Sequence, residues 1–230
     1  MKRLATTVLG TMLLVALANT AFAALRVPQV PVLGGGLQGY LNANDGGINV
    51  ATDQNAVQTW STTVSNNSTF SLMIELSGNA AANSIGIYNG AAAVPALYQV
   101  FPGAAASGWF ATAAFRTLPT RVVVNLFDAS AALQGTTTYL GADRTNFGYY
   151  LSGPGGTFYS QDVRNAGSAA QALTYAGTGV NSGQWWLGFE DTQIGGGSDQ
   201  DYDDAVLFLE SVNPTPVSRS TWGALKSRMR

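Results

Sequence analysis

Short segments in which apolar and polar residues alternate recur along the chain, separated by clusters of Gly, Asn, Asp, Ser and Pro. Phe70, Leu72 and Ile74 fall on alternate positions, which is the period of a β-strand with one face in a core. Similar runs rich in β-branched and aromatic residues predict further strands at 85–88, 97–101, 121–127, 147–151, 185–189 and 205–212. No helical period competes, and we interpret the alanine-rich stretch 104–115 as loop and strand.

Many short strands at close spacing predict an all-β fold. We expect a single-domain, jelly-roll-like antiparallel β-sandwich over residues 37–213. A chain of this size buries roughly 70% of the surface that it exposes when unfolded, which is enough for one core without disulfides. Residues 24–36, with two prolines and three consecutive glycines, are predicted to form an exposed lead-in.

The first residues have the form of a secretory signal peptide. A basic pair is followed by an apolar run over residues 4–17 and by a small-x-small cleavage pattern at 21–23. The run is shorter than the roughly 20 residues that a membrane span needs. We therefore expect residues 1–23 to be removed, leaving an exported chain, extracellular or at the cell surface, without a transmembrane span; a single-span anchor is the alternative.

The composition excludes several kinds of chemistry. The chain has no Cys and no His, and its only lysines are Lys2 and Lys226, near the two ends. Triads based on His, thiolate nucleophiles and conventional zinc sites are therefore excluded, and we do not expect an enzyme. With 10% charged residues, a net charge of -2 and no basic stripe in the body, nucleic acid is not an expected partner either.

Acidic residues concentrate near the end of the expected domain. Six of the 13 fall in one short stretch: Glu190, Asp191, Asp199, Asp201, Asp203 and Asp204. No Lys or Arg lies between Arg164 and Arg219. Carboxylates held this close, if even partly buried, must be protonated, paired or bound to a cation. Oxygen ligands on an adaptable glycine loop suit Ca2+, so we predict a structural Ca2+ site, with a solvated acidic turn as the alternative.

The flanks of this cluster predict a hairpin. The apolar runs 184–189 and 205–209 enclose the glycine turn 195–197, which places the acidic residues at the mouth of two paired strands.

An EF-hand loop is the competing interpretation of the same residues. Asp199, Asp201 and Asp203 match positions one, three and five of such a loop, and Glu210 matches position twelve. Asp204 stands where the loop needs glycine, however, and neither flank has the pattern of an amphipathic helix, which disfavours this interpretation.

The acidic stretch also resembles the F-E-D, G-G-G, D-x-D-Y-x-D signature of a domain of unknown function, common in exported bacterial proteins of the PEP-CTERM type. The matching residues are Phe189-Glu190-Asp191, Gly195-Gly196-Gly197 and Asp199-Gln200-Asp201-Tyr202-Asp203-Asp204. Weaker strand-like similarities extend over roughly 37–213. The resemblance implies a β-sandwich with no known catalytic activity, and we expect the exported chain to come from a Gram-negative-type bacterium. The resemblance also implies a calcium site at Glu190, Asp191, Asp199, Asp201 and Asp204.

The chain departs from this family in two places. Asn89 stands where the family often has Asp, and the family's V-P-E-P sorting tail is missing. Residues 214–230 instead form a basic tail in which Trp222, Leu225 and Met229 share one helical face. The tail is either an element that contacts an anionic surface or export machinery, or a frayed terminus.

We expect a secreted or cell-surface module, stabilised by Ca2+, with a structural, adhesive or matrix role and with surface glycans or matrix proteins as partners. The alternatives are a carbohydrate-binding module or a carboxylate-based glycoside hydrolase. Trp185, Trp186 and Tyr202 are the aromatic candidates for sugar stacking, and because Trp185 and Trp186 are adjacent on a strand, at most one lies in the core between the sheets. The candidate catalytic acids are Glu75, Glu190 and Glu210.

Overall fold

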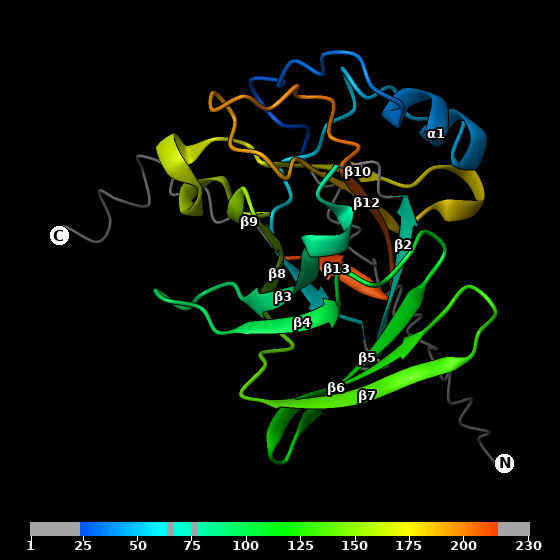
Figure 1. Ribbon diagram of the computed structural model, residues 1–230, viewed down its shortest axis with the longest axis vertical. Helices are drawn as coiled ribbons and strands as arrows, with labels where there is room; N and C mark the ends of the chain where they lie inside the picture. The colour runs from blue at the N-terminus through cyan, green and yellow to red at the C-terminus, as the bar shows by residue number, and fades with distance from the viewer. Residues whose placement is uncertain (1–23, 64–66, 75–77, 216–230) are drawn as a thin grey trace, which may run out of the picture.

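The computed structural model describes residues 24–63, 67–74 and 78–215, and of 67–74 it describes the backbone only. The predicted signal peptide, Glu75 and nearly all of the basic tail lie outside the described residues. The described chain forms thirteen β-strands, one α-helix and four short 3-10 helices (Figure 1). None of its helices has the length and apolar character of a membrane span.

All strand pairs are antiparallel, and the strands build two sheets that face each other. The first sheet, in the order β13-β1-β8-β3-β4 with β9 on β8, contains β1 (Trp60–Thr62), β3 (Ser84–Asn89), β4 (Leu97–Phe101), β8 (Phe147–Gly153), β9 (Gly156–Tyr159) and β13 (Val212–Pro214). The second, in the order β10-β11-β12-β2-β5-β6-β7, contains β2 (Asn67–Ile74), β5 (Phe110–Thr117), β6 (Thr120–Phe127), β7 (Leu133–Leu140), β10 (Ala172–Ala176), β11 (Trp185–Phe189) and β12 (Ala205–Glu210). The predicted antiparallel β-sandwich is confirmed.

The main core lies between the two sheets. Alternate residues of β5 and β6, among them Ala111, Ala113, Phe115, Val122 and Val124, point into it, as the two-residue period requires. Trp60 of β1 is fully buried there, with its ring centroid 4.9 Å from that of Tyr149 and 6.3 Å from that of Trp185 in the opposite sheet. The first contact lies within one sheet, whereas the edge-on contact of Trp60 with Trp185 joins the two sheets.

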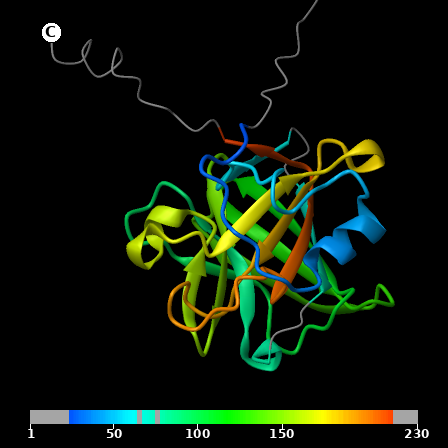
Figure 2. The same ribbon diagram turned by 90° about the horizontal axis from the view of Figure 1, so that it is seen from above.

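A second core covers the other face of the second sheet at its β10–β12 end. Here α1 (Leu37–Asn44), which the sequence did not predict, buries Leu37 and Leu41 one turn apart against Trp186 and the neighbouring strands (Figures 1 and 2). The side chain of Gln38 accepts a hydrogen bond from the Val50 N–H at 2.9 Å and donates one to the Ile48 carbonyl at 2.9 Å. The helix is thereby fixed to the segment that follows it.

The segment 24–36 has no helix or strand, and nine of its thirteen residues are exposed, but a few of its residues attach it to the domain. Arg26 is buried and its N–H bonds the Gln54 carbonyl at 2.8 Å, while Val30 and Val32 pack on the second core. One carboxamide, that of Gln54, donates to the Val30 carbonyl and accepts from the Val30 N–H, so it replaces a strand partner for this segment. We call residues 24–36 the strap.

The four 3-10 helices lie in connections between strands. They are η1 (Ala80–Ala82), η2 (Asp162–Arg164), η3 (Ala166–Ser168) and η4 (Gly179–Asn181). The first three border the sites described below.

Candidate metal site

The acidic residues lie in the loop between β11 and β12, as predicted. The two strands pair from Trp185↔Leu209 to Phe189↔Ala205, so Glu190 directly follows one strand and Asp204 directly precedes the other. The loop folds back over β11, which is possible because residue 188 is glycine: a Cβ there would lie 2.4 Å from the Tyr202 carbonyl oxygen. The predicted hairpin is confirmed.

Glu190 is the centre of this loop. Its side chain is fully buried, and Oε1 accepts the Tyr202 N–H at 2.5 Å. Its Oε2 accepts the Gln200 N–H at 3.3 Å and the hydroxyl of Ser198. Gln200 and Tyr202 adopt left-handed φ angles of 59° and 58°, an unfavourable conformation that turns both amides toward the carboxylate. The loop is therefore shaped around one buried negative charge.

Asp199 and Asp201 join Glu190. Each of the three residues offers a carboxylate oxygen, and these oxygens lie within 4.8 Å of one another. Two ligands on opposite sides of a Ca2+ ion are about 5 Å apart, because each Ca–O distance is about 2.3–2.6 Å. Asp199 is exposed and Asp201 is half-buried, so a cation would have access from solvent on the Asp199 side. The three residues can therefore hold one cation.

The electrostatics of the cluster disfavour its ionised state. Burial raises the pKa of Glu190, and the charges of Asp199 and Asp201 add to this effect against the opposing hydrogen bonds from Ser198 and Tyr202. Burial also raises the pKa of Asp201. The same cause raises the pKa of Asp204 to about 7, against the hydrogen bond from the Asp191 N–H. A bound cation would compensate these carboxylates.

The other three predicted ligands have different partners. Asp191 accepts hydrogen bonds from the side-chain amides of Asn79 at 3.2 Å and Asn83 at 2.9 Å, which fixes the loop to η1 and its flank. Asp203 accepts the Gly36 N–H. Asp204 accepts the Asp191 N–H at 2.8 Å, closing the hairpin mouth. The structure thus brings together three of the six residues, and the remaining three hold the surrounding chain.

The strap is part of the site, which the sequence did not indicate. The Leu33 N–H donates to the Gln200 carbonyl at 2.8 Å, and Gly36 donates to Asp203. Between them, Gly35 passes so close to Asp201 that a Cβ would lie 2.4 Å from the Asp201 Cβ. The strap therefore closes one side of the acidic loop.

The aromatic residues near the loop do not form a sugar-stacking surface. Trp185 is 5% exposed and belongs to the core between the sheets, whereas Trp186 and Tyr202 are 2% and 0% exposed and belong to the second core. The two adjacent tryptophans point to opposite faces of the sheet, as predicted: Trp185 lies between the sheets, and Trp186 is covered on the other face. The carbohydrate-binding alternative cannot rest on these three side chains.

The two described glutamates do not form a catalytic pair. Glu190 follows β11, and Glu210 ends β12 at the other end of the hairpin, where its Oε1 accepts the Gln184 side-chain N–H at 3.1 Å. Six residues of strand separate the two ends, which is roughly 20 Å, and carboxylate pairs in glycosidases are about 5–9.5 Å apart. Glu210 is also too far from the acidic loop to be the position-twelve ligand of an EF-hand. The loop is flanked by strands, whereas an EF-hand loop is flanked by helices.

Comparison with protein-family models, with curated proteins and with solved structures finds no match to this chain. The resemblance of the acidic loop to the exported bacterial family therefore stays a prediction.

Proposed function

We propose that this protein is a non-enzymatic, exported module whose β-sandwich is stabilised by one Ca2+ ion bound by Glu190, Asp199 and Asp201. The observation that carries the proposal is the placement of a fully buried glutamate beside two further carboxylates, with their oxygens within 4.8 Å of one another. None of the Lys or Arg side chains in the described part of the chain forms an ion pair with these three residues.

The ligand chemistry favours Ca2+ over other ions. The cluster offers only oxygen ligands, and Ca2+ accepts six to eight of them in adaptable geometry, whereas Mg2+ requires a near-ideal octahedron. Extracellular modules bind Ca2+ with dissociation constants of about 10⁻⁴–10⁻³ M, which matches an exported protein that meets millimolar Ca2+.

The ion's role in the proposed module is mechanical. It would join the end of β11, the acidic loop and, through Asp201 and Gly35, the strap. At 100-fold excess over its dissociation constant the ion would stabilise the fold by about 2.7 kcal/mol. A sandwich held in this way suits a structural, adhesive or matrix role at the cell surface, with surface glycans or matrix proteins as partners.

The test is the thermal melt of the purified protein in excess Ca2+ and in chelator. We expect chelation to lower Tm by roughly 5–10 °C. Asp199→Asn is the sharpest variant, because no hydrogen bond from another described residue reaches the exposed Asp199 carboxylate. The variant should lose the response to Ca2+ and, with one repulsive charge fewer, should melt in chelator at or above the wild-type temperature.

Glu210→Gln is the matched control. Glu210 lies on the same hairpin, at the opposite end, and would be a ligand only in the EF-hand interpretation. The control should keep the full response to Ca2+. Coincident wild-type curves in Ca2+ and chelator would overturn the proposal, as would an Asp199→Asn variant that responds like the wild type.

A further inference from the structure

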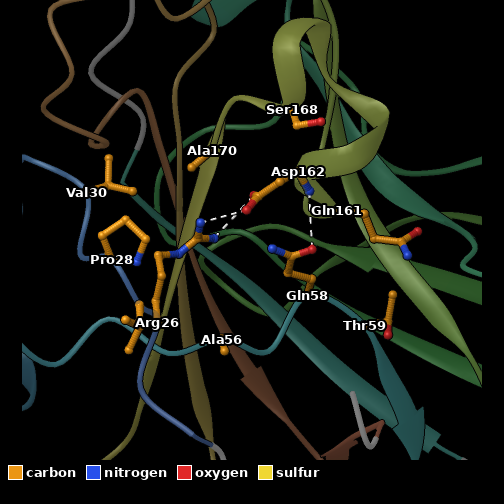
Figure 3. Close-up of a pocket in the computed structure, with 11 residues that line it drawn as sticks. Arg26, Pro28, Val30, Ala56, Gln58, Thr59, Gln161, Asp162, Ser168 and Ala170 are labelled. Atoms are coloured by element: carbon orange, nitrogen blue, oxygen red, sulfur yellow. Dashed lines mark hydrogen bonds and ion pairs between the residues drawn. The ribbon is translucent and has the colours of Figure 1, made fainter. Parts of the chain in front are cut away.

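A cleft of about 590 Å³ lies between the first residues of the strap, the segment before β1, and the chain around η2 and η3 (Figure 3). Its volume is in the range of sites that bind small molecules. It shares no residue with the Glu190, Asp199 and Asp201 cluster.

An ion pair forms part of the wall. Arg26 Nη1 donates to Asp162 Oδ2 at 2.7 Å, and Nη2 donates to Oδ1 at 3.2 Å, as Figure 3 shows. The two side chains are 10% and 20% exposed, so the pair is largely desolvated although it borders the cleft. The Nε–H of Arg26 is buried and has no partner within the described chain.

Two carboxamides extend the polar wall. Gln58 Oε1 accepts the Asp162 N–H at 3.3 Å, and Gln161 Oε1 accepts the Arg164 Nε–H at 2.6 Å and the Tyr88 hydroxyl at 3.1 Å. These bonds fix the orientation of both amides. Neither side-chain NH2 group donates to another residue in the ranges that the structure describes, so both are free for a ligand.

Most of the remaining lining is aliphatic, and Thr59 and Ser168 add two hydroxyl-bearing side chains. Pro28, Val30, Ala56 and Ala170 line the cleft between the polar groups. The cleft therefore combines donors on Arg26, Gln58 and Gln161, an acceptor on Asp162, and apolar surface, with no net charge from the ion pair.

The donors, the acceptor and the apolar surface of the cleft together determine which class of ligand it can bind. An anion would be repelled by Asp162 and a cation by Arg26, and an apolar ligand would leave the NH2 groups of Gln58 and Gln161 without water or partners. A hydroxyl both accepts and donates, so neighbouring hydroxyls can bridge the guanidinium and the carboxylate, while ring C–H groups pack on the aliphatic lining. We propose that this cleft binds a neutral saccharide through adjacent hydroxyl groups.

The inference names the ligand class for the proposed adhesive function. The adhesive role rests on the proposed function, whereas the saccharide site itself does not. Sugar binding and calcium binding use different residues and different assays. Either proposal can therefore fail while the other holds.

The experiment probes the purified wild-type protein, in Ca2+, with an array of neutral mono- to tetrasaccharides, followed by calorimetry with the sugar retained best. Ala56→Leu fills the cleft without removing a polar group, and Ala132→Leu places the same side chain on the exposed turn between β6 and β7. We expect Ala56→Leu to weaken binding at least 10-fold with an unchanged melting curve, and Ala132→Leu to bind like the wild type. Asp162→Asn, which keeps the shape but weakens the acceptor, should also weaken binding.

Retention of no sugar on the array at millimolar concentration would overturn the inference. Binding that is equally strong in Ala56→Leu and the wild type would also overturn it, because the sugar would then lie elsewhere. If Ala56→Leu alters folding, the same calorimetric comparison is made with Asp162→Asn. A folded Asp162→Asn variant that binds the sugar with the wild-type dissociation constant would overturn the proposal that the sugar lies in this cleft.

Discussion

The indole N–H of Trp186 donates a hydrogen bond to the Asp45 carboxylate at 2.9 Å. Asp45 is the C-cap residue directly after α1, and it is 5% exposed. The same carboxylate accepts the Thr178 N–H at 3.0 Å, the Thr178 hydroxyl and the Asn181 side-chain N–H at 3.3 Å. One buried charge thus joins the helix to the turn between β10 and β11 and to a strand of the sheet. This carboxylate, like Glu190, is buried among neutral donors, but no acid in the described part of the chain raises its pKa as Asp199 and Asp201 raise that of Glu190.

Asp45→Asn should destabilise the fold by about 2 kcal/mol, because an amide cannot accept from all these donors and turns its own NH2 group toward some of them. Chemical denaturation at pH 7 measures the loss. Asp53→Asn is the matched control: Asp53 is half-buried and accepts the Asn49 N–H at 2.7 Å in an exposed turn, so its loss should stay below about 0.5 kcal/mol. Equal losses in the two variants would contradict the assignment of Asp45 as the clamp of α1.

The pH dependence of this clamp has a defined sign. Burial alone would raise the pKa of Asp45, but the hydrogen bonds from Thr178, Trp186 and Asn181 outweigh it and hold the pKa below its ordinary value. The unfolded chain therefore binds a proton at a higher pH than the native protein does. The stabilisation by Asp45 is complete above the ordinary pKa of about 4 and is lost as pH falls through the lowered native value.

The stability difference between wild type and Asp45→Asn should consequently shrink as pH decreases below about 4. Denaturant unfolding of both proteins between pH 7 and pH 2.5 measures this difference, and titrations shared by both proteins cancel in it. A difference that is constant over the range, or larger at low pH, would show that the native pKa of Asp45 is not lowered.

The strands that could be predicted from the sequence are those with a strong local pattern of apolar residues. The helix α1 could not be predicted, because it is stabilised by residues that are distant along the chain. Trp185–Phe189 is buried on both faces, and the run of apolar residues there required a cover on the outer face. The cover is α1, but α1 is eight residues long, contains Gly39 and buries only Leu37 and Leu41. Two apolar positions cannot establish a helical period. Strand β7 was missed for a different reason: it is an exposed edge with no alternation to detect.

The sequence placed the acidic residues in the correct loop. It did not indicate which of them would already be occupied by hydrogen bonds to other parts of the chain. Asp191 and Asp203 match the acidic pattern as well as Asp199 does. Their oxygens are occupied by Asn83 and Gly36, which lie 108 and 167 positions away along the chain. Sequence spacing identifies a cluster of like charges, whereas only the tertiary fold determines which of them already have hydrogen-bond partners.

Two neighbouring glycines test how tightly the strap closes the acidic loop. Gly34 and Gly35 have φ angles of 87° and 71°, so alanine is strained at both. A Cβ at Gly34 meets nothing within 4 Å, whereas a Cβ at Gly35 would overlap Asp201. We expect Gly34→Ala to cost about 1 kcal/mol and Gly35→Ala about 3 kcal/mol, because the overlap adds to the same backbone strain.

Chemical denaturation gives the two free energies, and amide hydrogen exchange shows where the strap opens. Gly35→Ala should expose the Leu33 and Gly36 amides, whose acceptors are on the acidic loop, while Gly34→Ala should leave them protected. Similar costs for the two variants would mean that the strap can move away from Asp201 without loss.

The other end of the strap is held by the pair of Arg26 and Asp162, and a double-mutant cycle measures that attachment. Removing either partner leaves the other charge largely buried without a counter-ion, so Arg26→Gln and Asp162→Asn should each cost more than an exposed pair would. The double variant leaves no such charge. We therefore expect it to be more stable than the sum of the single losses predicts, with a coupling of about 1–2 kcal/mol in chemical denaturation. Additive losses would mean that water replaces either partner without penalty, and the pair would then contribute no more than a contact on the open surface.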